Sequence, residues 1–466
     1  MAMSETAAAA SEPNPVITEN KMGVMPISRL LITMSIPMMI SMFVQALYNI
    51  VDSIFVSRLG ENALTAVSLA FPVQNLMIAV GIGTAVGINA TLSRSLGEKN
   101  PERVDKTAYN GIFLALVSAV VFALFGLFFV RIFFNAQTNN TEIIAYGCDY
   151  LSICSMLSFG AFGQITFERL LQSTGKTFYT MITQTAGAIV NIILDPIMIF
   201  GLLGFPRLEV TGAAIATVIG QIAAMTLAII FNIKVNREIT LKFRGVRPDA
   251  EIIGKILSIG IPTAIMIAIS SVMTFGLNKI LLSFTSTAAA VFGVYFRLQG
   301  FLFMPIFGLN NGMIPIISYN YGARSRHRIV KTIRLSVIYS ISIMAVGVAV
   351  FQIFPMQLLS LFNASPEMIS IGIPALRIIS LSFVFAGFCI VSGSVFQALG
   401  RGLPSMFIST ARQLVALLPL AYLMSTLGGL DAIWWAFPMA ETVSLALTVF
   451  FLGYYYKNEI KPLPGN

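Results

Sequence analysis

Charged residues are scarce in this sequence, and their scarcity excludes an ordinary soluble protein. Only 11% of the 466 residues are Asp, Glu, Lys or Arg, and 56% are hydrophobic, whereas soluble domains carry about 25% charged residues. Several uncharged runs are long enough to cross a hydrocarbon layer of about 30 Å as helices; they are residues 30–51, 112–130, 177–194 and 335–362. Because backbone groups in lipid must be paired within their own span, we expect an all-α integral membrane protein.

Histidine, cysteine and nucleotide-binding signatures are scarce as well. The one histidine, His327, lies in a basic loop, and the three cysteines have no metal-ligand spacing. We therefore expect no histidine-based metal centre or triad and no structural disulfide. The sequence has no G-x-x-x-x-G-K-[ST] loop for ATP hydrolysis and no G-x-S-x-G elbow. These absences argue against an enzyme and against a cofactor, and any active transport must draw on an ion gradient.

Hydropathy predicts a polar tail followed by twelve membrane spans. Residues 1–27 are polar and lack the basic region of a cleaved signal, so they predict a disordered cytoplasmic tail. The spans are expected at residues 28–56, 63–93, 106–133, 142–171, 177–203, 211–234, 253–284, 290–319, 328–360, 367–398, 403–427 and 432–457. Several are longer than a bilayer requires, so their ends should tilt or project into water.

The distribution of basic residues predicts the orientation. If the N-terminus is cytoplasmic, the cytoplasmic segments hold 21 Lys and Arg residues and the outer segments hold only Arg58, Arg131 and Arg207. This asymmetry follows the positive-inside rule, so both termini should be cytoplasmic in a multi-pass protein of the cell membrane. The formal net charge of +9 is explained by this bias and does not indicate nucleic-acid binding.

The two halves of the chain are related by a repeat. An offset of 225 residues aligns Pro37 with Pro262, Gly83 with Gly308, Gly87 with Gly312 and Gly97 with Gly322. Each half has six spans, an even number, so the repeats enter the membrane in the same orientation. We expect an N-terminal lobe at 28–234, a cytoplasmic linker at 235–252, a C-terminal lobe at 253–457 and a cytoplasmic tail at 458–466, with a cleft between the lobes.

Two aspartates deep in the N-terminal lobe are the strongest functional candidates. Asp52 and Asp195 come late in two spans of the same direction, so they should lie at similar depth. Each ends a polar helical stripe; the stripes are Ser41, Gln45, Asn49 and Asp52, and Gln184, Asn191 and Asp195. These polar groups are either helix-packing contacts or a functional site. We favour function for the aspartates, because ionisable residues without a basic partner inside a membrane usually mark ion or substrate paths.

Other polar residues in the spans are weaker candidates. Glu168 stands beside Arg169, so we expect an ion pair at the inner rim. Glu441 is a second candidate site, and the cations of the C-terminal lobe, expected to be buried, are its candidate partners; they are Arg297, Arg377 and Arg412. Asn310 and Asn311 are candidates for the cleft surface. Gly83 and Gly87 belong to a small-residue face for close helix packing.

Five segments together resemble the multidrug and toxic compound extrusion (MATE) family over nearly all of residues 28–457. They are "QALYNIVDSIFVSRLG", "GIGTAVGINATLSRSLG", "NIILDPIMIFG", "TGAAIATVIGQ" and "VYFRLQGFLFMPIFGLNNG". The resemblance implies two six-helix lobes. A span 7 glutamate of the NorM-like branch is missing, since Ser270 stands eight residues after Pro262. The chain therefore looks DinF-like, similar to MepA-type exporters.

The resemblance also implies a function and a site. It implies a monomeric secondary antiporter that exports amphipathic organic cations by alternating access, in exchange for H⁺ or Na⁺. In the DinF-like branch the ion site corresponds to Asp52, Asn191 and Asp195 here, completed by a threonine, for which Thr217 is our choice and Thr211 the alternative. The residues leave one other reading open, because the C-lobe arginines suit an anionic substrate. That reading is a flippase for lipid-linked precursors or a polysaccharide exporter of the same superfamily.

The orientation can be tested by cysteine labelling in intact cells. Single cysteines placed in residues 57–62 should react with a membrane-impermeant maleimide, because that loop is expected outside the cell. Cysteines placed in residues 234–255 should react only after permeabilisation. Labelling of the second loop in intact cells would overturn the proposed orientation.

Overall fold

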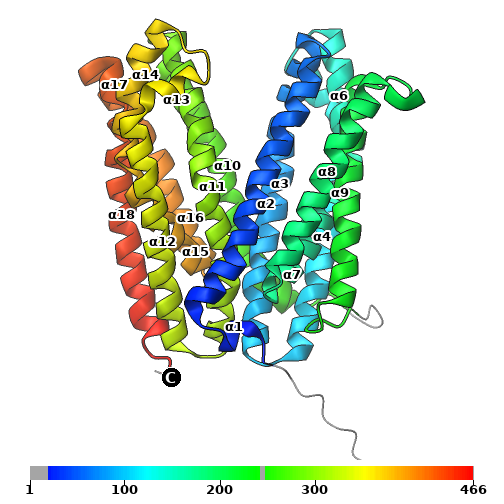
Figure 1. Ribbon diagram of the computed structural model, residues 1–466, viewed down its shortest axis with the longest axis vertical. Coiled ribbons are helices and arrows are strands. Elements are labelled where there is room, and N and C mark those ends of the chain that lie inside the picture. Colours follow the sequence, from blue (N-terminus) through cyan, green and yellow to red (C-terminus); the bar gives the residue numbers. More distant parts are fainter. Residues whose placement is uncertain (1–18, 242–246, 465–466) are drawn as a thin grey trace, which may run out of the picture.

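The computed structural model describes residues 19–241 and 247–464, and these residues form a V of two helical lobes (Figure 1). The N-lobe consists of α1 (Lys21–Val24), α2 (Ile27–Ser57), α3 (Glu61–Gly97), α4 (Pro101–Phe128), α5 (Val130–Asn135), α6 (Thr141–Met156), α7 (Phe159–Ser173), α8 (Thr177–Phe200), η1 (Leu202–Gly204) and α9 (Glu209–Lys234). The C-lobe consists of α10 (Ala250–Leu282), α11 (Ser286–Gly322), α12 (Arg326–Ile353), α13 (Pro355–Ser360), α14 (Pro366–Ser380), α15 (Phe383–Ala398), α16 (Gly402–Thr410), η2 (Ala411–Leu417), α17 (Leu418–Ile433), α18 (Ala436–Tyr455) and η3 (Tyr456–Ile460).

The described residues contain ten helices that are long and apolar enough to cross a membrane, and two bent pairs. The pair α6 and α7 bends by 43°, and the pair α14 and α15 bends by 50°. Counting each bent pair as one span gives the twelve predicted spans in an all-α membrane fold. The two bends occupy corresponding places in the two halves, which agrees with the sequence repeat.

Short polar residues begin many of the helices. The side chains of Asn100, Asn140, Asp249 and Ser365 each accept a hydrogen bond from a backbone N–H of the helix that follows. Such caps pair backbone donors that the first turn leaves free. They explain why the chain turns at these loops and re-enters the membrane there.

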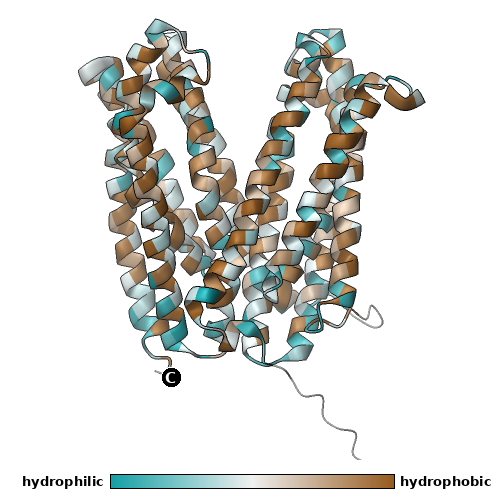
Figure 2. Ribbon diagram, viewed as in Figure 1, coloured by the Kyte–Doolittle hydropathy of each residue, from teal (hydrophilic) through white to brown (hydrophobic). Residues whose placement is uncertain are grey.

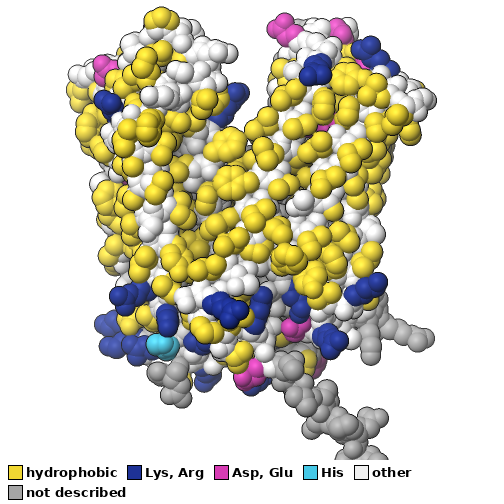
Figure 3. Space-filling model, viewed as in Figure 1, with side chains coloured by type: hydrophobic (Ala, Val, Ile, Leu, Met, Phe, Trp, Pro, Cys, Tyr) yellow, Lys and Arg dark blue, Asp and Glu magenta, His cyan; other side chains and the backbone are white. Residues whose placement is uncertain are grey.

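The surface of the molecule matches a lipid environment. Hydrophobic residues predominate along the middle of the helices, and hydrophilic residues gather toward the two ends (Figure 2). Basic side chains cluster at the end of the molecule that carries α1 and η3, which we call the terminal end (Figure 3). The opposite end, which we call the open end, is hollowed between the lobes (Figure 3).

The lobes are joined by helix pairs whose backbones approach closely. Helix α3 packs on α10, and α2 packs on α11. A Cβ added to Gly87 would overlap the carbonyl oxygen of Ile256, and one added to Gly312 would lie 2.5 Å from the hydroxyl oxygen of Ser35. Glycines at these repeat-related positions therefore allow the contact between lobes, as small residues do in membrane helix pairs.

The ends of α3 and α11 meet in a symmetric contact that we call the glycine crossing. A Cβ on Gly97 would overlap the carbonyl oxygen of Tyr319, and a Cβ on Gly322 would overlap the carbonyl oxygen of Arg94. These four residues form two pairs separated by 225 positions, so the same contact is made from both sides of the repeat. The crossing closes the molecule at the terminal end.

Part of the predicted disordered tail is ordered. Residues 19–27 include α1, and Met22 is fully buried. The Asn20 side chain donates to the carbonyl oxygen of Thr174 in the N-lobe at 3.0 Å, and the Arg328 guanidinium donates to the carbonyl oxygen of Met25 at 2.8 Å. The segment was expected to be disordered because it is polar, but it is held by contacts to both lobes. Residues 1–18 lie outside the described residues.

The predicted linker is partly described. Glu238 pairs with Lys176, and Asp249 caps α10. Residues 242–246, which include the basic Lys242 and Arg244, lie outside the described residues. Helix α10 begins at Ala250, three residues before the lobe boundary predicted at 253.

The glycine crossing predicts a substitution effect. Gly97→Ala should push α3 and α11 apart and lower the free energy of unfolding by about 1–3 kcal/mol, because the added methyl group has no space. Gly254→Ala is the matched control, since no atom lies within 4 Å of its added Cβ. Spin labels at Lys106 and Lys331 should report a wider distance in Gly97→Ala only. An unchanged distance together with unchanged thermal stability would contradict this account of the crossing.

Candidate functional site

The two candidate aspartates come together inside the N-lobe. Asp52 lies on α2 and Asp195 on α8, two helices that pack on each other. Asp195 is fully buried, and Asp52 is half-buried with its Oδ1 enclosed. The two carboxyl groups lie close enough for their charges to interact. No ion pair of either residue occurs in the part of the chain that the structure describes. Two neighbouring carboxylates repel each other unless a proton or a cation is shared between them.

Asn191 links this pair to α9. It lies one turn before Asp195 and is 2% exposed. When its amide is oriented so that both ends are paired, Nδ2 donates to Oδ2 of Asp195 at 3.2 Å and Oδ1 accepts from the backbone N–H of Thr217 at 3.2 Å. Of the two threonines considered, Thr217 is therefore the one beside Asn191. No hydrogen bond joins Thr211, in the first turn of α9, to this cluster within the described residues.

Close packing of α8 and α9 makes this arrangement possible. A Cβ on Gly187 would lie 2.9 Å from the carbonyl oxygen of Gly220, and one on Gly220 would lie 3.1 Å from the Cβ of Asn191. The two glycines let the helix backbones approach, so the Asn191 amide reaches the neighbouring backbone. Pro196, which follows Asp195 within α8, leaves one backbone carbonyl of the preceding turn without its usual donor.

Two neighbours of the aspartates, and a third residue that binds one of these neighbours, were not among the sequence candidates. Tyr48, one turn before Asp52, lies close to both carboxyl groups, and Tyr150 on α6 lies close to Asp52. The side chain of Gln74 on α3 donates to the Tyr150 hydroxyl at 3.2 Å. Tyr48 is detectable in the sequence through its i, i+4 spacing to Asp52. Tyr150 and Gln74 carry no such signal, because only tertiary packing brings α3 and α6 to this place.

The remaining members of the polar stripes lie elsewhere. Ser41 is buried, whereas Gln45 and Asn49 are exposed, so neither of these two side chains is enclosed with Asp52 and Asp195. A functional role for Gln45 and Asn49 stays a prediction. Gln184 is too far along α8 from Asp195 to join it, and its Nε2 donates instead to Glu168 at 2.8 Å.

The predicted ion pair between Glu168 and Arg169 is wrong. Glu168 is 3% exposed and accepts hydrogen bonds from three side chains; they are Gln164 at 3.1 Å, Thr183 at 3.0 Å and Gln184 at 2.8 Å. Arg169 instead donates to Oδ1 of Asn311 in the C-lobe at 3.1 Å. Adjacent residues on a helix point about 100° apart, so they do not face each other. Asn310 is buried, and its Oδ1 has no partner among the described residues.

The C-lobe contains an aromatic cavity of about 230 Å³ in place of an acidic pair. Its lining includes Phe292, Tyr295, Phe303, Phe383 and Phe437, together with Ser270, Arg412 and Glu441. The Arg412 guanidinium donates to Oε2 of Glu441 at 3.2 Å from the π-helical segment η2. Leu277, 225 residues after Asp52, is fully buried. The two lobes therefore share a fold but carry different chemistry.

The expectation that three arginines of the C-lobe are buried is wrong, since even Arg412 is partly exposed. Arg297 and Arg377 are exposed, and only Arg412 pairs with Glu441. Hydropathy places a residue within a span, but the helix face on which it stands decides whether it is buried.

The contact between Arg412 and Glu441 predicts a coupling in stability. Glu441→Gln should lower the free energy of unfolding by about 1–3 kcal/mol, because the Arg412 guanidinium loses a charged partner. The double variant Arg412→Gln with Glu441→Gln should be more stable than the sum of the single effects implies. Thermal unfolding of the four purified proteins measures the coupling. Strictly additive effects would show that the ion pair contributes nothing.

Comparison with known proteins identifies the family. The MatE family model matches residues 37–197 and 262–423, once in each half and again with an offset of 225 between the starting residues. The chain is 28% identical to the multidrug export protein MepA of Staphylococcus haemolyticus over 91% of this chain and 93% of that protein. It is 26% identical to a FAD transporter of Shewanella oneidensis over 92% and 94%.

The fold agrees with solved structures of this family. An outward-facing multidrug resistance MATE transporter superposes with a TM-score of 0.88 at 26% identity, covering 96% of this chain and 100% of that one. The repeated match to the family model and this superposition span both lobes. The chain therefore belongs to the MatE family of membrane transporters.

Proposed function

We propose that this transporter exports amphipathic organic cations in exchange for H⁺, with Na⁺ as the alternative coupling ion. The observation that carries the proposal is the carboxyl pair of Asp52 and Asp195, which is enclosed in the N-lobe without a basic partner among the described residues. Asn191 and Thr217 complete the proposed ion site. The MepA relative, a multidrug export protein, supports the substrate class.

The geometry supports a cycle driven by neutralisation. Without a bound ion, the two carboxyl groups repel each other and attract a cation. A proton that enters from the open end neutralises the pair and lets α2 and α8 repack, with Pro196 as the place where α8 can bend. The repacking expels the drug cation. Each charge that moves down a membrane potential of 100 mV supplies about 2.3 kcal/mol.

The proposed orientation places the terminal end in the cytoplasm of a cell-membrane protein. Basic side chains gather at that end (Figure 3), as the positive-inside rule requires. The open end would then face the outside, as in the outward-facing transporter that superposes on this chain. Both lobes belong to one chain, so we expect the monomer to be the transporting unit.

An anionic substrate is the second candidate. The FAD transporter among the relatives favours it, and it fits the alternative of a lipid-linked precursor or polysaccharide exporter. Arg297 and Arg377 are exposed and have no ion-pair partner among the described residues. Against this reading, the Arg412 charge that lines the C-lobe cavity is balanced by Glu441.

Neutral substitutions of the aspartates test the proposal. Asp52→Asn and Asp195→Asn should each abolish gradient-driven transport while the protein stays folded, because each imitates the neutralised state permanently. Uptake of ethidium into everted vesicles, driven by a pH gradient or a Na⁺ gradient, is the measurement. Asp149→Asn is the matched control, since Asp149 is exposed on α6 in the same lobe. Glu441→Gln should also retain substantial transport.

Two results would reject the proposal. One is ethidium uptake at the wild-type rate by the double variant of Asp52 and Asp195 at matched expression. The other is uptake of FAD, but not of ethidium, by the wild-type protein in the same vesicles, which would establish the anionic alternative.

A further inference from the structure

A second cavity lies between the two lobes at the terminal end, away from the proposed ion site. It measures about 350 Å³. Arg94 and Arg103 line it from the N-lobe, and Lys255 and Arg401 line it from the C-lobe. Thr91 and Ser258 also line it, and none of its lining residues in the described part of the chain is a carboxylate. Four partly exposed cations therefore line one space, which exists only while the two lobes are together at this end.

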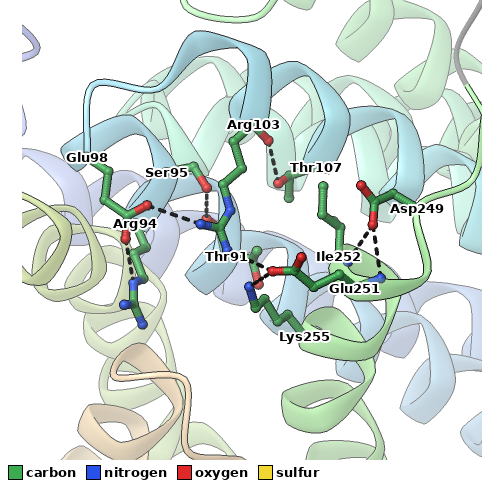
Figure 4. A network of polar contacts seen from close by, with 10 residues as sticks. All are labelled: Thr91, Arg94, Ser95, Glu98, Arg103, Thr107, Asp249, Glu251, Ile252 and Lys255. Atoms are coloured by element: carbon green, nitrogen blue, oxygen red, sulfur yellow. Dashed lines mark hydrogen bonds and ion pairs between the residues drawn. The ribbon is translucent and has the colours of Figure 1, made fainter.

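The carboxylates around the cavity do not fully balance these cations. Glu98 is shared by Arg94 at 2.9 Å and Arg103 at 3.5 Å (Figure 4). Glu251 is shared by Lys255 and by Arg103 at 3.8 Å. Arg401 pairs with Glu459 at 2.9 Å. Four cations thus meet three carboxylates, so one positive charge and several N–H donors are left for another acceptor.

The guanidinium of Arg94 is held in place for such a ligand. It lies 4.8 Å from the ring centroid of Tyr321 on the C-lobe, a stacking contact that fixes the plane of the group. An arginine fixed in this way offers a rigid pair of donors that matches the oxygens of a phosphate. Lys255 adds a compact positive charge from the opposite lobe.

We propose that this cavity binds a phosphate group and thereby ties the two lobes together at the terminal end. Basic pockets between membrane helices on the cytoplasmic side are suited to anionic headgroups, so the group can belong to a lipid of the inner leaflet or to free phosphate. Binding stabilises the conformation that is closed at this end, because the residues that bind the phosphate come from both lobes. The inference does not depend on the ion-coupling role of Asp52 and Asp195.

Lipid titration of the delipidated, purified protein tests the site by native mass spectrometry. Phosphatidic acid should bind with one high-affinity site, and diacylglycerol, which lacks the phosphate, should not. Arg94→Gln combined with Lys255→Gln should weaken phosphatidic acid binding about 25-fold, because each basic residue near an anionic headgroup contributes roughly fivefold. Lys331→Gln combined with Arg334→Gln removes the same charge from exposed positions of α12 and should leave binding unchanged.

Two further measurements sharpen the test. A competition experiment identifies the source of the phosphate, and a second variant tests the site without removing an ion pair. Inorganic phosphate that displaces phosphatidic acid from the wild-type protein identifies a site for the phosphate group itself, whereas failure to displace it identifies a lipid site. Ser258→Glu, which places a negative charge in the cavity without removing an ion pair, should abolish binding. Equal weakening by both double variants, or full binding by Ser258→Glu, would overturn the proposal.

Discussion

The crossing of two helix ends, backbone against backbone, determines the form of the whole molecule. At Gly97 and Gly322 the lobes touch through main-chain atoms, and side chains are excluded by the carbonyl oxygens of Tyr319 and Arg94. A contact this close at one end leaves the lobes free to diverge at the other, which produces the V (Figure 1). Opening the terminal end requires this contact to separate. The N-terminal segment and the charged cavity beside the crossing add further contacts that hold the same end closed.

The two lobes have the same helix arrangement but different polar side chains at repeat-related positions. Asp52 corresponds to the buried Leu277 in the repeat, and Arg412 corresponds to Gly187, which lies in the tight contact of α8 with α9. The N-lobe therefore encloses two carboxyl groups in a closely packed pair of helices. The C-lobe encloses a compensated ion pair beside an aromatic cavity. The fold thus tolerates different side chains at repeat-related positions, which agrees with a proposed ion site in the N-lobe alone.

Some features were predictable because they depend on spacing alone. The twelve spans follow from hydropathy, the two lobes follow from the repeat, and the depth of Asp52 and Asp195 follows from their positions late in two spans of the same direction. Contacts that depend on which face of a helix is covered were less predictable. Glu168 and Arg169 are neighbours in sequence but bind different partners, and Arg297 lies in a span yet is exposed.

The sequence by itself determined the membrane class, the number of spans, the repeat and the short list of intramembrane carboxylates, because hydropathy and periodicity are properties of neighbouring residues. Only the tertiary structure decided that Thr217 rather than Thr211 stands beside Asn191, that Tyr150 lies near Asp52, and that Gln184 donates to Glu168. The four cations of the terminal cavity are spread from Arg94 to Arg401, and no short sequence window joins them. These contacts arise where separate helices pack, and packing is set by the shapes of both partners rather than by either segment alone.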